Sequence, residues 1–326
     1  MNLRFLEPRV LADLYARAGD ARRAETLMRR FSADAARFVL LLSGLGLLAG
    51  LAALIGLALL AVFLWTARDK RWSRVARVST QPRALTWGDG IDAFLFYLTF
   101  YRGLGLIVGG LILPLLVRGG DPATTLGARG EIVLSAVIQF AGGLGAVAYL
   151  AARARRAGSS LARIGLASPG GLMADIGYGV AGYLAILPLV IALGMLSQQI
   201  FRHFPNTTPN PVLPLLTADN GLVGRLLIFA MISVGAPFFE ELFFRGALFG
   251  ALRARFPWVA SAVISAILFA IVHPPVNWLP IFGLGFGMAT MREMRQSLVP
   301  SIVAHFLQNT ASFVFLSLLF GGGSGG

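Results

Sequence analysis

Cysteine is absent from this chain of 326 residues, and charged residues are scarce at 13%. The lack of cysteine excludes disulfide bonds, thiolate metal sites and a cysteine nucleophile. The scarcity of charge excludes an ordinary soluble domain, in which charged residues make up about 25% of the composition. Outside the Gly/Ser tail of the last six residues no G-x-S-x-G motif occurs, so the nucleophilic serine of an α/β-hydrolase is not indicated.

Apolar sequence is what the chain has in abundance. Hydrophobic residues make up 56% of it, and the mean hydropathy is +0.74. Several apolar stretches reach the ~20 residues with which a helix crosses a bilayer. The sequence therefore predicts an all-α fold, a polytopic transmembrane helix bundle with about eight membrane segments. We place these segments at residues 38–65, 91–117, 131–152, 172–200, 221–252, 257–274, 278–291 and 299–320.

The domain organisation follows from the same division. Residues 1–37 are polar and arginine-rich, with apolar side chains at roughly helical spacing. They predict an amphipathic helix or helix pair on the membrane surface, and a solvated tail is the alternative. N-terminal transmembrane helices are expected over 38–170 and C-terminal ones over 171–320. The last residues, 321–326, read GGGSGG, a Gly/Ser tail that is either native or an added linker.

The net charge of +13 is carried mainly by loops and tails. Loops 66–90, 153–171, 253–256 and 292–298 hold fourteen Lys/Arg, whereas loops 118–130, 201–220 and 275–277 hold three. The positive-inside rule then predicts that the first group faces the cytoplasm. The eight arginines of residues 1–37 conflict with this orientation if segment 38–65 crosses the membrane once. No Lys/Arg stripe is interleaved with aromatics, so nucleic acid is not expected as a partner.

The stretch FFEELFFR, residues 238–245, places two adjacent carboxylates deep inside an apolar segment. An ionised group at mid-membrane costs about 2.5–3.5 kcal/mol even on the mildest insertion scale, so such residues indicate a functional site. Glu241 and Arg245 are spaced i, i+4 and share a helix face, which favours an ion pair. Glu240 points about 100° away from Glu241, so the two carboxylates are expected to have different roles.

Two of the three histidines also belong to apolar segments. His273 follows Phe269 at i, i+4, and His305 precedes Asn309 at the same spacing. Counted at ~1.5 Å per residue from the loops on one side, Glu240 lies ~20 Å deep, His273 ~25 Å, His305 ~10 Å and Asn309 ~16 Å. These four side chains can therefore meet within the membrane. The glycines at 283, 285 and 287 predict close packing of helices.

A buried carboxylate beside a histidine can deprotonate a water, and a histidine with an asparagine can donate hydrogen bonds to a developing oxyanion. Such a set suits hydrolysis of an amide bond by direct attack of water. Two alternatives stay open. Glu240, His273 and His305 could form a two-His, one-carboxylate zinc site, although HExxH is absent. The polar cluster could also be purely structural, in a membrane protein that binds a partner.

Three motifs occur in order on three apolar segments: E-E-x-x-x-R from Glu240 to Arg245, F-x-x-x-H ending at His273, and H-x-x-x-N from His305 to Asn309. Over about residues 170–320 the chain resembles the CPBP family of intramembrane proteases, which includes the type II CAAX prenyl endopeptidases and bacterial bacteriocin-immunity (Abi) proteins. The resemblance implies an eight-helix bundle with an intramembrane glutamate protease site and no cofactor. It implies that Glu240 and His273 activate the water, that His305 and Asn309 form the oxyanion hole, and that Glu241 and Arg245 support the site.

The expected function is that of an intramembrane, metal-independent endopeptidase, whose partners are a peptide or protein substrate and the lipid bilayer. The Ala-, Arg- and Gly-rich composition resembles a product of a GC-rich bacterial genome, which points to the bacterial inner membrane and against a prenylated substrate. The alternative from another class is a non-catalytic membrane binding or immunity protein.

Overall fold

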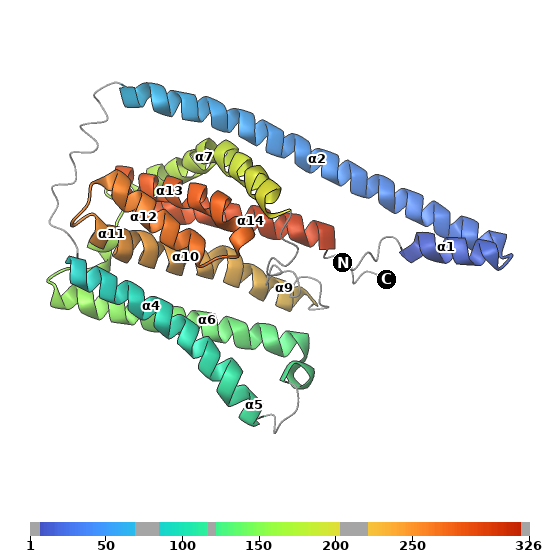
Figure 1. Cartoon of the computed structure of the whole chain (residues 1–326), viewed down its shortest axis with the longest axis horizontal. Coiled ribbons are helices and arrows are strands. Elements are labelled where there is room, and N and C mark those ends of the chain that lie inside the picture. The colour runs from blue at the N-terminus through green and yellow to red at the C-terminus, as the bar shows by residue number, and fades with distance from the viewer. Residues whose placement is uncertain (1–6, 69–84, 117–121, 203–220, 321–326) are drawn as a thin grey trace. The chain divides into compact units, whose positions relative to one another are not determined.

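The computed structural model describes residues 7–68, 85–116, 122–202 and 221–320 (Figure 1). They divide into two units, Met1–Ile55 and Gly56–Gly326, which are described separately. The described residues are helical and contain no β-strand, so the predicted all-α class is confirmed. Three parts of the sequence lie outside the described residues: the basic residues between Asp69 and Ala84, His203, and the GGGSGG tail.

The first unit contains α1 (Glu7–Arg17) and the first part of α2 (Ala21–Arg68). Gly19, with φ of 83°, allows the sharp turn between them, and Asp20 accepts a hydrogen bond from the Arg23 backbone N–H, which starts α2. These residues therefore form two helices joined by a turn, and their place on the membrane surface stays a prediction. No break occurs at residue 37, since α2 runs without interruption from the arginine-rich part into the first apolar segment.

Each predicted membrane segment corresponds to a helix. Among the described residues, six helices are long and apolar enough to cross a membrane: Val39–Val62, Trp87–Leu115, Gly130–Arg156, Leu172–Phe201, Gly221–Leu252 and Val299–Leu319. The other two predicted segments form the shorter helices α12 (Trp258–Ile271) and α13 (Trp278–Arg295). In chain order, the elements after α2 are α4 (Trp87–Ile107), η3 (Val108–Ile112), α5 (Leu113–Leu116), α6 (Pro122–Arg156), η4 (Ala162–Leu166), α7 (Leu172–Phe201), α9 (Gly221–Phe229), η5 (Ala230–Gly235), α10 (Ala236–Glu241), η6 (Leu242–Leu248), α11 (Phe249–Leu252), α12 (Trp258–Ile271), η7 (Pro275–Asn277), α13 (Trp278–Arg295) and α14 (Val299–Phe320).

The elements from α9 to α11 form one continuous helix over residues 221–252, here called the glutamate helix, which lies at the centre of the second unit (Figure 1). On one side it packs against α4, where the Tyr97 and Phe243 rings stack at 4.2 Å and Phe94 meets Phe244 at 4.9 Å. Helices α12, α13 and α14 contact its other side. Leu242 and Phe243 are fully buried, so this helix forms the core.

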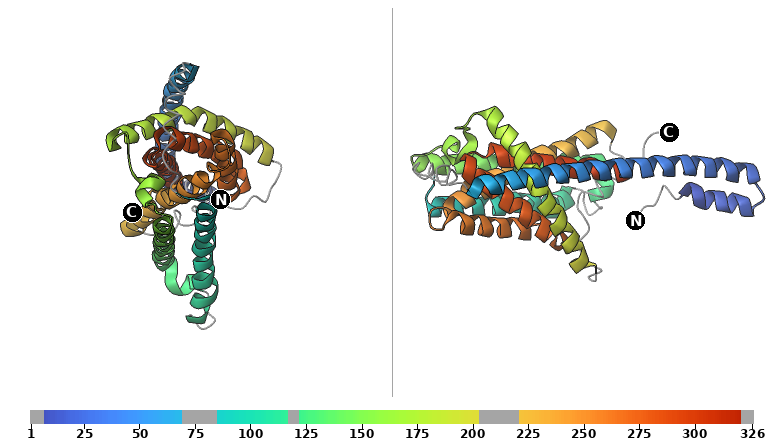
Figure 2. Two further views of the ribbon diagram at one scale, coloured as in Figure 1. Left: turned by 90° about the vertical axis from the view of Figure 1, so that its left-hand side faces the viewer. Right: turned by 90° about the horizontal axis from the view of Figure 1, so that it is seen from above.

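Helix α7 lies across α13 and α14 (Figure 2). Glycine makes the close approach possible, because a Cβ added at Gly179 would lie 2.7 Å from the Pro300 carbonyl oxygen. An added Cβ would lie 2.7 Å from the Leu193 side chain at Gly283 and 2.8 Å from Ile186 at Gly287. The predicted packing role is confirmed for these two glycines of α13.

The basic loops that the charge pattern assigned to one side of the membrane meet at one end of the second unit. Three contacts join them: the Trp87 and Phe256 rings at 6.2 Å, the Arg253–Glu293 ion pair at 2.8 Å, and the Leu298 N–H donating to the Gly165 carbonyl at 2.7 Å. Arg295 also pairs with Asp175, just after loop 153–171, at 2.7 Å. The described ends of all four loops thus lie together, as the alternation of charge requires. That this end faces the cytoplasm stays a prediction.

Candidate active site

Two π-helical turns flank the pair of glutamates in the glutamate helix. η5 ends at Gly235 and η6 begins at Leu242, so only the short α10 separates them. A π turn leaves some backbone carbonyls without their usual helical donors, and such turns often mark functional sites. Pro237, at the start of α10, has no backbone N–H and removes one more donor. The glutamates therefore sit on a segment whose backbone depends on neighbouring helices.

Glu241 and Arg245 form the ion pair that their spacing predicted. Arg245 Nη1 donates to Glu241 Oε1 at 2.9 Å, and both side chains have 0% exposure. Arg245 Nη2 also donates to the Gly285 carbonyl at 3.2 Å, and its guanidinium lies 4.2 Å from the centre of the Phe269 ring. The charge of Arg245 is thus compensated by a carboxylate, a carbonyl and an aromatic face.

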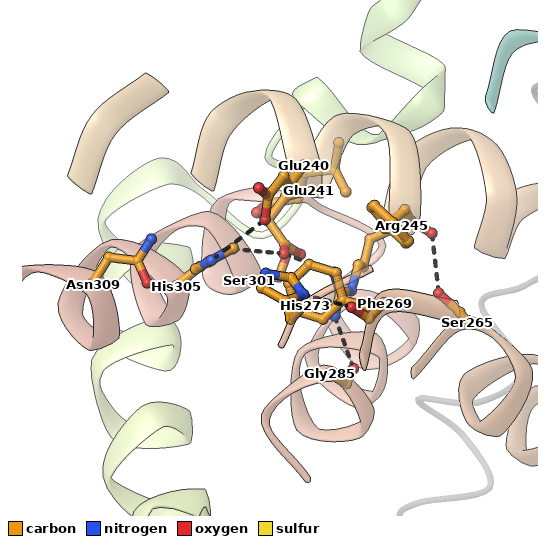
Figure 3. Close-up of polar contacts among 12 residues, drawn as sticks. Glu240, Glu241, Arg245, Ser265, Phe269, His273, Gly285, Ser301, His305 and Asn309 are labelled. Atoms are coloured by element: carbon orange, nitrogen blue, oxygen red, sulfur yellow. Dashed lines mark hydrogen bonds and ion pairs between the residues drawn. The ribbon is translucent and has the colours of Figure 1, made fainter. Parts of the chain in front are cut away.

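His305 bridges the two glutamates (Figure 3). Its Nδ1 lies 3.1 Å from Glu241 Oε1, while its Nε2 lies 3.8 Å from Glu240 Oε2. A carboxylate accepts hydrogen bonds, so Nδ1 carries the proton, and Nε2 faces Glu240. The distance of 3.8 Å is too long for a direct hydrogen bond, so Nε2 and the Glu240 carboxylate are close but not bonded.

Glu240 differs from Glu241 in its surroundings. Its side chain is 23% exposed, and none of the described residues donates a hydrogen bond to it. The adjacent Glu241 is fully buried and has both Arg245 and His305 as partners. The sequence-based expectation of two different roles therefore has a structural basis, with one carboxylate fixed in the protein and the other accessible.

His273 lies just beyond the end of α12, which Pro274 and Pro275 prevent from continuing. Its Nδ1 lies 2.8 Å from the Phe269 carbonyl oxygen, which can only accept, so Nδ1 is protonated and Nε2 is left free. Its side chain is partly buried and forms no hydrogen bond with Glu240. A water or substrate atom lying between His273 and Glu240 would therefore need a separate contact with each of these side chains.

Phe269 has a role that the sequence analysis did not assign. Its ring is 1% exposed and contacts the Arg245 guanidinium as well as both imidazoles, with ring centres 5.0 Å from His273 and 5.6 Å from His305. One aromatic side chain thus separates and orients the three cationic or titratable groups. The available signal was the i, i+4 spacing of Phe269 and His273, which was noted without a function.

Asn309 lies one turn beyond His305 on α14 and donates from Nδ2 to the Ile232 carbonyl in η5, at 2.8 Å. A side-chain amide has two N–H donors, so one stays available when the other binds Ile232. Asn309 and His305 do not bond to each other among the described side chains.

Direct contacts join Glu240, Glu241, Arg245 and His305. His273 is instead bonded to the Phe269 carbonyl, and Asn309 to the Ile232 carbonyl. Within the described part of the chain, no three His, Cys, Asp or Glu side chains lie close enough to bind one metal ion.

Gly285 provides a test of this arrangement. A Cβ added there would lie 3.1 Å from Arg245 Nη2 and 3.3 Å from the Ala266 Cα. Gly285→Ala is therefore expected to displace the guanidinium and to lower the free energy of unfolding by about 1–3 kcal/mol, as overpacking does. The matched control is Gly250→Ala, because nothing lies within 4 Å of its added Cβ. That variant should be as stable as the parent or slightly more stable. Thermal unfolding in detergent compares the two, and equal stabilities would contradict the packing described here.

Comparison with known families adds an independent observation. Residues 222–311 match the family model described as "Rce1-like: Type II CAAX prenyl endopeptidase Rce1-like". This matched region, here called the Rce1-like domain, is therefore similar to CPBP proteases. All six candidate residues lie inside it, on the glutamate helix, at the end of α12 and on α14, whereas α4, α6 and α7 lie outside.

The chain is also similar to "Putative membrane peptidase YdiL" of Bacillus subtilis (strain 168), with 31% identity over 85 residues. The aligned segment makes up 26% of this chain and 35% of that protein. The chain therefore spans about a third of the length of this relative. No solved structure matches the chain. Family and fold agree on a multi-pass membrane protein related to proteases.

Proposed function

We propose that this protein is an intramembrane endopeptidase of the glutamate type, with Glu240 and His273 activating the attacking water. The observation that supports it best is the contrast between the two glutamates. Glu241 is fixed by Arg245 and His305, while Glu240 is 23% exposed, accepts no hydrogen bond from the described residues and faces His305 Nε2. A general base must be accessible and free to take a proton, and Glu240 meets both conditions.

In the proposed reaction, a water lies between the Glu240 carboxylate and His273 Nε2. Glu240 takes one proton from the water as the oxygen bonds to the carbonyl carbon of a peptide. The carbonyl oxygen becomes an oxyanion, which accepts hydrogen bonds from His305 Nε2 and from the second N–H of Asn309. When the C–N bond breaks, Glu240 returns the proton to the leaving amine, so the enzyme ends in its starting state.

Glu241 and Arg245 act in this scheme by orienting His305. Because His305 Nδ1 already donates to Glu241, the ring can donate to an oxyanion from Nε2 only when both nitrogens carry protons. Arg245 holds the Glu241 carboxylate in place for that contact. These roles follow the family resemblance and the geometry, and they are part of the proposal.

The proposed setting is the bacterial inner membrane, with the end formed by the basic loops in the cytoplasm. The proposed substrate is a peptide or protein cleaved near the membrane surface, and neither nucleic acid nor a metal cofactor takes part. A zinc site of Glu240, His273 and His305 is the alternative chemistry for the same reaction.

Metal independence is tested by adding a strong chelator to the purified protein during cleavage of a fluorogenic peptide library. We expect the cleavage rate with chelator to stay within about twofold of the rate without it, because general acid–base catalysis needs only the side chains. A loss of activity that returns when Zn²⁺ is added would replace the glutamate mechanism with the zinc alternative.

A second candidate function is a non-catalytic membrane protein that binds a peptide or partner. Two observations favour it: the Asn309 amide is bonded to the Ile232 carbonyl, and His273 has no bond to Glu240. This candidate predicts no cleavage of any peptide by well-folded protein, together with saturable binding of a peptide from the same library.

A further inference from the structure

The π turn η5, just before the glutamates, has two backbone carbonyls that receive side-chain amides from other helices. The Ala236 N–H donates to the Met231 carbonyl, five residues back, as a π turn requires. The corresponding donor for Ile232 would be residue 237, which is a proline. Asn309 Nδ2 takes that place on α14 at 2.8 Å, and Gln139 Nε2 donates to Met231 from α6 at 2.7 Å.

Gln139 is a buried amide on a mostly apolar helix. It is 7% exposed, and burying an amide is costly unless it is hydrogen-bonded. Gly235, the last residue of η5, lets α6 approach closely, because a Cβ there would lie 3.0 Å from the Phe140 ring and 3.1 Å from Gln139 Nε2. The contact is therefore specific, and it comes from residues outside the Rce1-like domain.

The π-helical form of η5 determines the direction in which the side chains after it point around the axis of the glutamate helix. Converting a π turn to regular α-helix shifts the following residues by about one position, or about 100° around the axis. Residue 240 would then point where residue 239 or 241 now points. Both neighbours are buried, with exposures of 4% for Phe239 and 0% for Glu241.

We propose that Gln139 is a positioning residue: by holding the Met231 carbonyl it keeps η5 in the π form that turns Glu240 toward the accessible side of the site. Asn309 acts on the adjacent carbonyl in the same way. The effect on catalysis rests on the proposed function, whereas the effect on the direction of residue 240 does not.

The absence of cysteine makes the direction of residue 240 measurable. Glu240→Cys is combined with Gln139→Met, which keeps the side-chain length but removes the N–H donor, or with Tyr149→Phe as control. Tyr149 is on the same helix, and its hydroxyl donates to Asp92 on α4 instead of to the glutamate helix. We expect a water-soluble maleimide to modify the thiol introduced at position 240 at least about fivefold more slowly with Gln139→Met, and at the parent rate with Tyr149→Phe.

Catalysis gives the second measurement, in chains that keep Glu240. Gln139→Met should lower kcat by about 10–100-fold and leave KM within about twofold, since a misdirected base weakens the chemical step more than binding. Tyr149→Phe should leave both constants unchanged. A purely structural role of Gln139 would lower the unfolding temperature without either change.

Equal modification rates in the Gln139→Met and Tyr149→Phe backgrounds would overturn the inference. If Gln139→Met does not fold, Gln139→Ala is measured in the same way, because it leaves room for a water to bond Met231. If the parent protein cleaves no peptide, the proposed function fails, but the modification rates of the introduced thiol still decide the role of Gln139.

Discussion

Glu240→Gln is expected to lower kcat for peptide cleavage by at least about 10³-fold while leaving the protein folded. The amide cannot take a proton from water, and a general base commonly contributes about 10²–10⁴-fold. The fold should survive because Glu240 accepts no hydrogen bond from the described residues and is 23% exposed. Single-turnover cleavage by purified protein in detergent, beside a thermal unfolding curve, measures both effects.

The control for this variant is Glu131→Gln, which changes a carboxylate near the start of α6, outside the candidate site. It should cleave at the parent rate. Residual activity above about a tenth of the parent in Glu240→Gln would remove Glu240 from the role of base. Glu241 is not expected to replace Glu240 as the general base, because it is fully buried and already paired with Arg245.

Arg245→Met is expected to cause the largest loss of stability, about 3–5 kcal/mol, because it leaves the Glu241 carboxylate buried without its cation. Arg245 and Glu241 both have 0% exposure, so water cannot replace the missing partner. His305 should also lose its fixed orientation, since its Nδ1 contact with Glu241 depends on the position of that carboxylate. Chemical unfolding in detergent measures the change.

Two further variants separate charge pairing from packing. Combining Glu241→Leu with Arg245→Met removes both charges and should restore most of the stability, because an apolar pair can replace a buried ion pair. It should not restore cleavage, since His305 would have no carboxylate at Nδ1.

Arg29→Met is the exposed control. It breaks the ion pair with Glu25, in which the two side chains are 81% and 64% exposed, and should cost under about 1 kcal/mol. A loss from Arg245→Met as small as that would contradict a supporting role for the pair.

Much of this arrangement could be predicted because it depends on composition and regular spacing. Runs of apolar residues located the helices, and the i, i+4 spacing of Glu241 and Arg245 predicted their ion pair. Depth counting predicted that Glu240 and His305 could meet, and they do. The continuation of α2 through residue 37 was not predicted, because the change from arginine-rich to apolar sequence suggested a boundary there. Arginine and most apolar residues both favour a helix, so this change in composition does not end α2.

The parts that could not be predicted depend on tertiary contacts. A π turn has no distinct sequence pattern, and η5 is held by amides from α6 and α14, which are far away in the chain. The same applies to the Asn309 side chain, whose partner Ile232 is 77 residues away. Counting residues along helices gives depth, but it does not give the rotation of each helix, so the lack of a bond between His273 and Glu240 was not foreseen.

The central place of the glutamate helix limits how far this protein can be shortened or recombined. The recognisable region, residues 222–311, presents Phe243 and Phe244 to Tyr97 and Phe94 of α4, and Phe239 lies against Gly143 of α6. A chain that began at residue 222 would expose this aromatic surface and lose its partners. We therefore expect the smallest autonomous unit to include α4 and α6, and grafting the recognisable region alone onto another bundle should fail.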